Sequence, residues 1–156
     1  MAGIAGFGKA CELAQKRVDS LEFLNLSSLR EHFYQLVSTL ISGVEIFGDL
    51  ENRLPNTLNL GFEAVEGDTL LISLDMAGVA VSTGSACSSG SGLPSPVLIA
   101  MGIPFDKINS SIRFSFGWSN TTAEIEKVAK ILAQTVSLNR TGTPADVKNK
   151  KLMKSL

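Results

Sequence analysis

Ser111-Ile-Arg-Phe-Ser-Phe116 alternates polar and apolar side chains at every position. Because successive side chains of an extended chain point to opposite faces, this alternation predicts a β-strand with one apolar face. Arg113 then lies on the polar face. The same alternation occurs in Thr57-Leu-Asn-Leu-Gly-Phe-Glu63 and predicts a second half-buried strand. Two such strands favour a small antiparallel sheet that packs one face against helices.

On either side of these strands, apolar residues recur at the helical spacing of three and four. Residues 4–18 carry one such stripe, which includes Cys11. Residues 66–75 carry a shorter stripe, and Gly78 is placed to end that helix. A brief strand is expected directly afterwards, over residues 79–82.

Two further helices are marked by the spacing of a capping box, in which a hydroxyl residue is followed three positions later by Glu. Ser28 and Glu31 have this spacing before an apolar stripe that runs to residue 41. Thr121 and Glu124 have it before a stripe that runs to residue 136. We therefore expect helices to begin at both positions.

Residues 83–93 interrupt the regular pattern. This segment contains three glycines and four serines, a composition that predicts a mobile loop. Pro94, Ser95 and Pro96 suit the first turn of a helix that ends near residue 101. Residues 103–109 are expected to be a connection.

Composition limits the class of protein. The chain has 156 residues, of which 44% are hydrophobic and 19% charged, and these values indicate one globular domain. With 14 basic and 15 acidic residues, the chain has no positive field that would favour nucleic acid as a partner. No apolar run approaches the roughly 18 residues of a membrane span, so no membrane is expected. The first residues show no secretory signal, and a cytoplasmic protein is therefore expected.

These elements together predict an α+β fold, with a small antiparallel sheet covered on one face by helices. The folded domain is expected over residues 1–138, and its cysteine loop over residues 82–95. Residues 139–156 are basic and poor in large apolar side chains, so a disordered tail is expected there.

Cys87 and Arg113 are the two residues best placed to carry chemistry. An accessible thiol in a Gly/Ser loop is suited to act as a nucleophile or sulfur carrier, because the thiolate is the reactive species. An incidental loop thiol fits the composition equally well. The planar guanidinium of Arg113 is suited to hold a carboxylate at two points, and a surface ion pair is the simpler alternative.

Cys11 and His32 have structural explanations. Cys11 lies on an apolar helical stripe and is expected to be a small buried hydrophobic residue. His32, the only histidine, is expected on a helix surface without a catalytic role. The two cysteines are far apart in the sequence and show none of the close ligand pairs of metal sites, so no metal is expected.

A longer pattern around Cys87 is more specific. Val81-Ser-Thr-Gly-Ser-Ala-Cys-Ser-Ser-Gly-Ser91, followed by Pro94-Ser95, closely resembles the active-site loop of NifS/IscS-type cysteine desulfurases. The resemblance continues upstream in Arg53-Leu-Pro-Asn56 and Val65-Glu-Gly-Asp68, and downstream in Ser110-Ser-Ile-Arg-Phe-Ser-Phe-Gly117. It runs from residue 2 to about residue 132 and corresponds to the carboxy-terminal small domain of that family. Gly92-Leu93 departs from the Leu-Glu that family loops commonly have.

This resemblance implies the C-terminal domain of a fold-type I, class V aminotransferase-like enzyme that uses pyridoxal 5′-phosphate. It implies that Cys87 takes sulfur from L-cysteine as a persulfide and that Arg113 binds the substrate carboxylate. The family's cofactor lysine follows a histidine in the large domain, upstream of the resemblance, and no lysine here follows a histidine. We therefore expect a truncated form that binds no cofactor alone, so that activity as an enzyme depends on the missing domain.

Three functions are compatible with this resemblance. The preferred one is the small domain of a cysteine desulfurase, which needs its large domain or a full-length homologue and supplies sulfur for iron–sulfur cluster or thio-cofactor synthesis. The second is a stand-alone persulfide relay to a sulfur acceptor or iron–sulfur scaffold protein. The third is a non-catalytic assembly domain. Apolar surface left by a missing large domain is also expected to favour homo-oligomers.

Overall fold

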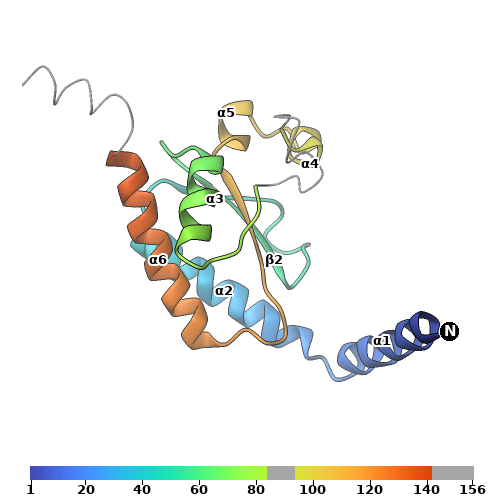
Figure 1. Cartoon of the computed structure of the whole chain (residues 1–156). Helices are drawn as coiled ribbons and strands as arrows, with labels where there is room; N and C mark the ends of the chain where they lie inside the picture. The colour runs from blue at the N-terminus through green and yellow to red at the C-terminus, as the bar shows by residue number, and fades with distance from the viewer. Residues whose placement is uncertain (84–93, 142–156) are drawn as a thin grey trace, which may run out of the picture.

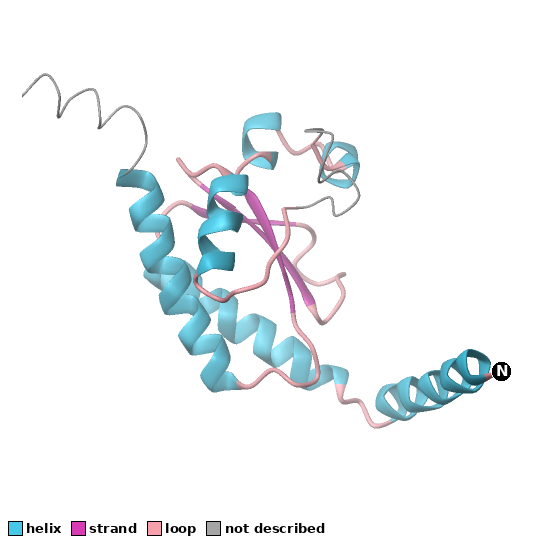
Figure 2. Cartoon of the chain, in the orientation of Figure 1, coloured by secondary structure: helices cyan, strands magenta, loops and turns pink. Residues whose placement is uncertain are grey.

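The computed structural model describes residues 1–83 and 94–141. Figures 1 and 2 show a small twisted sheet with helices packed around it and one helix that extends away from the rest. The elements follow in the order α1 (Ala2–Asp19), α2 (Phe23–Leu40), β1 (Val44–Phe47), β2 (Thr57–Phe62), α3 (Gly67–Met76), α4 (Pro96–Ala100), α5 (Phe105–Ile108), β3 (Ser111–Ser115) and α6 (Thr122–Thr141). The predicted α+β class is confirmed.

The sheet has the antiparallel order β1-β2-β3. Leu60 in the central strand pairs with Ile46 on one side and Ile112 on the other, so these three side chains share one face. Both strands predicted from alternation are confirmed. The edge strand β1 is not predicted by the sequence pattern, because four residues are too few for a clear alternation to emerge.

The apolar face of the sheet packs on α2 and α6, which lie side by side. Phe33 of α2 is 1% exposed and occupies the middle of this core. Its ring centroid lies 4.9 Å from that of Phe114 and 5.6 Å from that of Phe116. The alternation that predicts β3 thus directs its phenylalanines at α2.

The predicted start of α6 is confirmed in detail. The Thr121 backbone N–H donates to the Glu124 carboxylate at 2.8 Å, and the Glu124 N–H donates to the Thr121 hydroxyl at 3.3 Å. The helix continues to Thr141, three residues beyond the domain boundary expected at residue 138. The remainder of the expected tail lies outside the described residues.

The predicted start of α2 is wrong. The helix begins at Phe23, and the Ser28 hydroxyl lies within it, where it donates to the Leu24 carbonyl at 3.0 Å. Burial of Leu26 in the main core explains the difference, because that contact requires an additional helical turn before Ser28. Glu31 instead approaches Arg53, at 3.4 Å.

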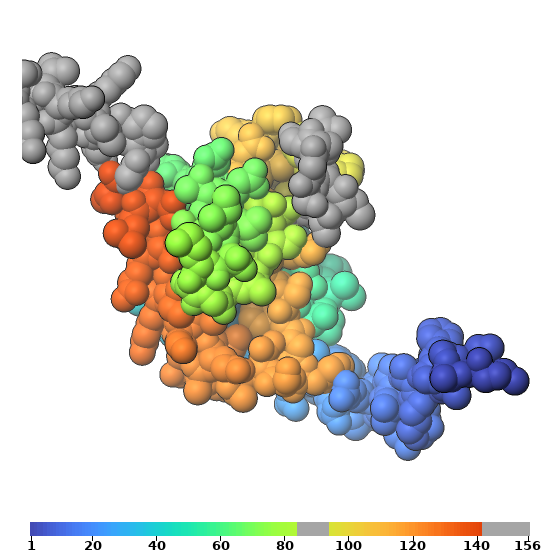
Figure 3. Space-filling view, in the orientation of Figure 1, coloured from blue at the N-terminus to red at the C-terminus, as the bar shows by residue number. Residues whose placement is uncertain are grey.

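The prediction of a buried Cys11 is also wrong. Every residue of α1 is exposed, including Cys11, and Figure 3 shows this helix projecting from the body of the molecule. The periodicity of residues 4–18 predicts the helix correctly but not what it packs against. Within the described ranges, the Arg17 guanidinium lies 5.0 Å from the centre of the Trp118 ring, near the end of this helix.

The short elements between residues 67 and 108 agree only in part with the prediction from the sequence. Helix α3 matches the prediction, and Gly78 follows it with a φ of 80°. The strand expected over residues 79–82 is only a single bridge, between Ser82 and Arg113. Helix α4 is present as predicted, and the expected connection contains the helical turn α5. Among the described helices, none is long and apolar enough to cross a membrane.

Candidate functional site

Ser82 and Arg113 are paired immediately before the Gly/Ser segment. The Arg113 N–H donates to the Ser82 carbonyl at 2.6 Å, and the Ser82 N–H donates to the Arg113 carbonyl at 3.2 Å. This bridge holds the chain beside β3 immediately before residues 84–93. Cys87, the predicted nucleophile, lies outside the described residues.

A close backbone contact at the start of α3 lies beside the chain that follows Ser82. The Gly67 N–H, at the start of α3, donates to the Asn109 carbonyl at 2.8 Å. A Cβ atom on Gly67 would lie 2.8 Å from that carbonyl oxygen and 3.5 Å from the Thr83 methyl group. Glycine in the Val65-Glu-Gly-Asp68 motif is therefore needed for the close approach of α3 to the Asn109 carbonyl, next to Thr83.

The described chain resumes at Pro94, and the residues that follow are also held in place. Ser95 is 5% exposed, and its hydroxyl oxygen accepts from the Leu98 N–H at 3.5 Å, which caps α4. Leu98 packs with Phe47 and Ile108 in a second apolar cluster. Phe47 lies on the sheet face opposite the main core, so α4 is attached to that opposite face.

A polar row crosses this second face of the sheet. In register, Phe47 of β1 pairs with Asn59 of β2, Asn59 pairs with Arg113 of β3, and Arg113 pairs with Ser82. These four residues therefore have side chains on the same face. We call Asn59, Arg113 and Ser82 the polar row.

Arg113 is half-buried in the polar row. Over residues 1–83 and 94–141, no hydrogen bond or ion pair to its side chain is found. Glu45, the acidic residue on the same face, is bound to Lys107 at 2.6 Å, and this hydrogen bond raises the pKa of Lys107. Arg113 thus offers an uncompensated guanidinium that suits an anion.

Asn59 is a polar residue of this face that the sequence analysis does not single out. Its Oδ1 atom is buried without a hydrogen-bond partner in the described part of the chain. Alternation alone places Asn59 on the polar face. It does not reveal that Arg113 lies opposite, because that depends on the register between two strands far apart in sequence.

The Arg53-Leu-Pro-Asn56 motif has a structural explanation. Arg30 of α2 is 9% exposed and donates to the Leu54 carbonyl at 2.8 Å. Burial, with the nearby charge of Arg53, lowers the pKa of Arg30. This contact secures the segment before β2 against α2.

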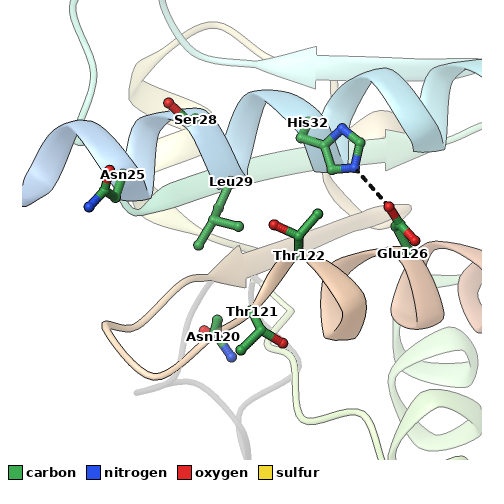
Figure 4. Close-up of a pocket in the computed structure, with 8 residues that line it drawn as sticks. All are labelled: Asn25, Ser28, Leu29, His32, Asn120, Thr121, Thr122 and Glu126. Carbon is green, nitrogen blue, oxygen red and sulfur yellow. Dashed lines mark ion pairs between the residues drawn. The ribbon is translucent and has the colours of Figure 1, made fainter.

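A separate groove of about 620 Å³ lies between α2 and α6 (Figure 4). His32 Nε2 lies 3.6 Å from Glu126 Oε1 across this groove, and the His32 side chain is 38% exposed, consistent with the expected helix surface. The other lining residues carry amides, hydroxyls or an apolar group; they are Asn25, Ser28, Leu29, Asn120, Thr121 and Thr122. Its lining residues come from the first half of α2 and from the start of α6, and in Figure 1 these parts of the two helices lie away from α4 and α5. It therefore does not belong with the polar row.

Metal binding finds no support in the described ranges. No group of three or more His, Cys, Asp or Glu side chains there is arranged to hold a metal ion.

Comparison with known proteins finds a matching family and similar sequences. The family model for aminotransferase class-V matches residues 1–128. A cysteine desulfurase from Gluconacetobacter diazotrophicus is 41% identical over 142 residues, which are 91% of this chain and 35% of that protein. A cysteine desulfurase IscS from Dictyoglomus turgidum is 43% identical over 144 residues, or 92% of this chain and 36% of that protein.

Solved structures of NifS-like proteins are also similar to this chain. A NifS-like protein from Rickettsia africae superposes with a TM-score of 0.73 at 28% identity, covering 86% of this chain and 34% of that one. Another NifS-like protein gives a TM-score of 0.71 at 28% identity, covering 83% of this chain and 32% of that one. This chain spans about a third of the length of the curated relatives it matches.

Proposed function

The chain belongs to the aminotransferase class-V family, and from this premise we propose that it is the sulfur-carrying small domain of a cysteine desulfurase. In this proposal residues 1–138 correspond to the C-terminal part of the enzyme, Cys87 receives sulfur from L-cysteine, and Arg113 binds the substrate carboxylate. The observation that carries it is the half-buried Arg113 side chain, which has no partner among the described residues and lies beside Ser82, just before the segment that contains Cys87. The chain is similar to cysteine desulfurases over nine-tenths of its length.

The proposed chemistry requires a group that this domain does not supply. The Cys87 thiolate forms a bond to the sulfur of L-cysteine while the carbon–sulfur bond of the substrate breaks. The carbon keeps the bonding electron pair and takes up a proton, so that the products are a Cys87 persulfide and alanine. An electron sink must stabilise that carbon, and pyridoxal 5′-phosphate supplies such a sink in the family the chain resembles.

The described residues do not fit this cofactor. Its carbonyl needs a lysine amine inside a pocket, and all five lysines in the described ranges are exposed. Lys9 and Lys16 pair with Glu12, and Lys107 pairs with Glu45. The groove between α2 and α6 is lined by neither lysine nor arginine, so it offers no ammonium or guanidinium group for a phosphate. The isolated chain is therefore proposed to be inactive and to depend on a large domain.

The wider setting follows from the same proposal. The domain works in the cytoplasm with a large domain or a full-length homologue, and its persulfide serves an acceptor such as an iron–sulfur scaffold protein. Exposed apolar side chains on α1, among them Ile4 at 75% and Phe7 at 73%, support association with such a partner or with a second copy.

Sulfur transfer to Cys87 is the direct test. The purified chain is incubated with L-cysteine and a catalytic amount of an active cysteine desulfurase, and intact-mass spectrometry follows the addition of one sulfur atom. A second arm supplies the large domain of a related desulfurase loaded with its cofactor, and alanine release is measured. The proposal expects alanine only when chain and large domain are both present, and it expects no alanine from the chain alone.

The two cysteines provide a matched control. Cys87→Ser should abolish alanine release, whereas Cys11→Ser should leave it unchanged, because Cys11 is exposed on a helix remote from the sheet. Sulfur addition at Cys87 without alanine release in the second arm would instead indicate a persulfide relay. Absence of both results would contradict any sulfur-carrying role and favour the assembly domain.

A further inference from the structure

Asn59 is a half-buried residue whose side-chain oxygen is itself buried. Its Oδ1 atom has no partner in the described ranges, although an unsatisfied buried polar group costs about 1–3 kcal/mol. Exchanging the amide oxygen and nitrogen would leave a buried donor unsatisfied instead. In either orientation the position calls for a partner on this face of the sheet.

The neighbouring groups on the face narrow the choice of that partner. The Ser111 hydroxyl donates to the Ile108 carbonyl at 2.8 Å, and the Thr57 hydroxyl donates to Asn56 Oδ1 at 3.4 Å. Phe47, on the other side of Asn59, is apolar and lies so close over Gly61 that a Cβ there would be 2.5 Å from its ring. Among the described neighbours, Arg113 has side-chain donors that make no hydrogen bond to residues 1–83 or 94–141.

The positive charge of Arg113 also calls for a binding partner. A half-buried guanidinium is costly unless an anion or hydrogen-bond acceptors compensate it. Asn59 and Ser82 flank it in the register and carry an amide and a hydroxyl but no charge. Asn59 and Ser82 can therefore orient the guanidinium without neutralising it. Its positive charge remains free to attract an anionic ligand.

We propose that Asn59 is a positioning residue, which fixes the plane of the Arg113 guanidinium so that the polar row binds one small carboxylate. The inference rests on the proposed function, because it refines how Arg113 takes the carboxylate of the substrate. The structure pairs the two residues in register without this hydrogen bond. In the proposed complex one Arg113 N–H donates to Asn59 Oδ1, and the remaining edge of the guanidinium donates two parallel hydrogen bonds to the carboxylate. Loss of the amide leaves the charge in place but allows the guanidinium to rotate.

The test measures carboxylate binding by the full chain, without cofactor or turnover. The ¹⁵N–¹H signal of the Arg113 side-chain Nε is followed by NMR during titration with propionate. Propionamide, which has the same shape without the charge, is the control ligand. We expect a saturable shift with propionate alone, and about fivefold weaker binding in Asn59→Ala, the loss of one hydrogen bond.

Two further variants separate positioning from a general structural effect. Asn59→Asp preserves the shape but places a carboxylate against Arg113, so it should abolish propionate binding while the chain remains folded. Ser115→Ala changes an exposed residue of the same strand face and should bind as the unmodified chain does. Equal propionate affinity in Asn59→Ala and the unmodified chain would overturn the positioning role but leave the sulfur assay at Cys87 unaffected. A propionate-insensitive Arg113 signal in the unmodified chain would overturn the carboxylate site itself.

Discussion

Gly67→Ala tests whether close backbone approach between the start of α3 and the segment before β3 stabilises the fold. The new Cβ would lie 2.8 Å from the Asn109 carbonyl oxygen and 3.2 Å from that of Ser111. A carbon and a carbonyl oxygen normally remain about 3.3 Å apart or more, so the backbone must move by about half an ångström. The hydrogen bond from the residue 67 N–H to Asn109 then lengthens.

The expected loss of stability follows from two opposing effects. Overpacking of this kind costs about 1–3 kcal/mol. Alanine is favoured over glycine within a helix by up to about 1 kcal/mol, which offsets part of that cost. We therefore expect the free energy of unfolding of Gly67→Ala to be lower by about 1–2 kcal/mol, with a melting temperature lower by about 3–8 °C.

Urea denaturation followed by circular dichroism measures this difference. Gly6→Ala is the matched control, because it makes the same chemical change in a helix where nothing lies within 4 Å of the new methyl group. It should lose no stability. Hydrogen exchange of the residue 67 amide adds a local measurement and should be faster in Gly67→Ala. An unchanged urea midpoint together with unchanged exchange would refute the close-approach explanation.

Two other substitutions test the core and the start of α6. Phe33→Ala removes the ring that contacts β3 and should cost about 3–5 kcal/mol in urea unfolding, and a loss below about 1 kcal/mol would contradict its central place in the core. The Thr121 N–H bound to the Glu124 carboxylate lowers the pKa of Glu124, so its stabilising effect is full above the ordinary glutamate pKa and disappears as pH falls through the lowered value. Glu124→Gln should therefore be less stable than the unmodified chain at neutral pH, with a difference that shrinks below about pH 4. A difference independent of pH would exclude the carboxylate as its source.

Local patterns predicted several elements well. The alternation in β2 and β3 was sufficient because each face of a half-buried strand meets a different environment along its whole length. The capping box at Thr121 and Glu124 was sufficient because its hydrogen bonds join residues three apart. The same spacing at Ser28 and Glu31 failed, since apolar residues before it extended the helix into the core.

Sequence patterns predicted only part of the candidate site. The position of Arg113 on a polar face followed from alternation and is present in the structure. The role of Gly67 was not apparent, because its neighbour Asn109 comes from a distant segment. The structure does not test the role of Cys87, which remains a prediction.

Residue order along the chain was thus enough to establish the α+β class, the polar face that carries Arg113 and the start of α6, because each depends on contacts within a few residues. Packing between distant segments settled the rest. It left Cys11 exposed, and it placed Asn59 beside Arg113. Strand register and helix docking depend on the fit of whole faces, and that fit forms only when the separate elements come together.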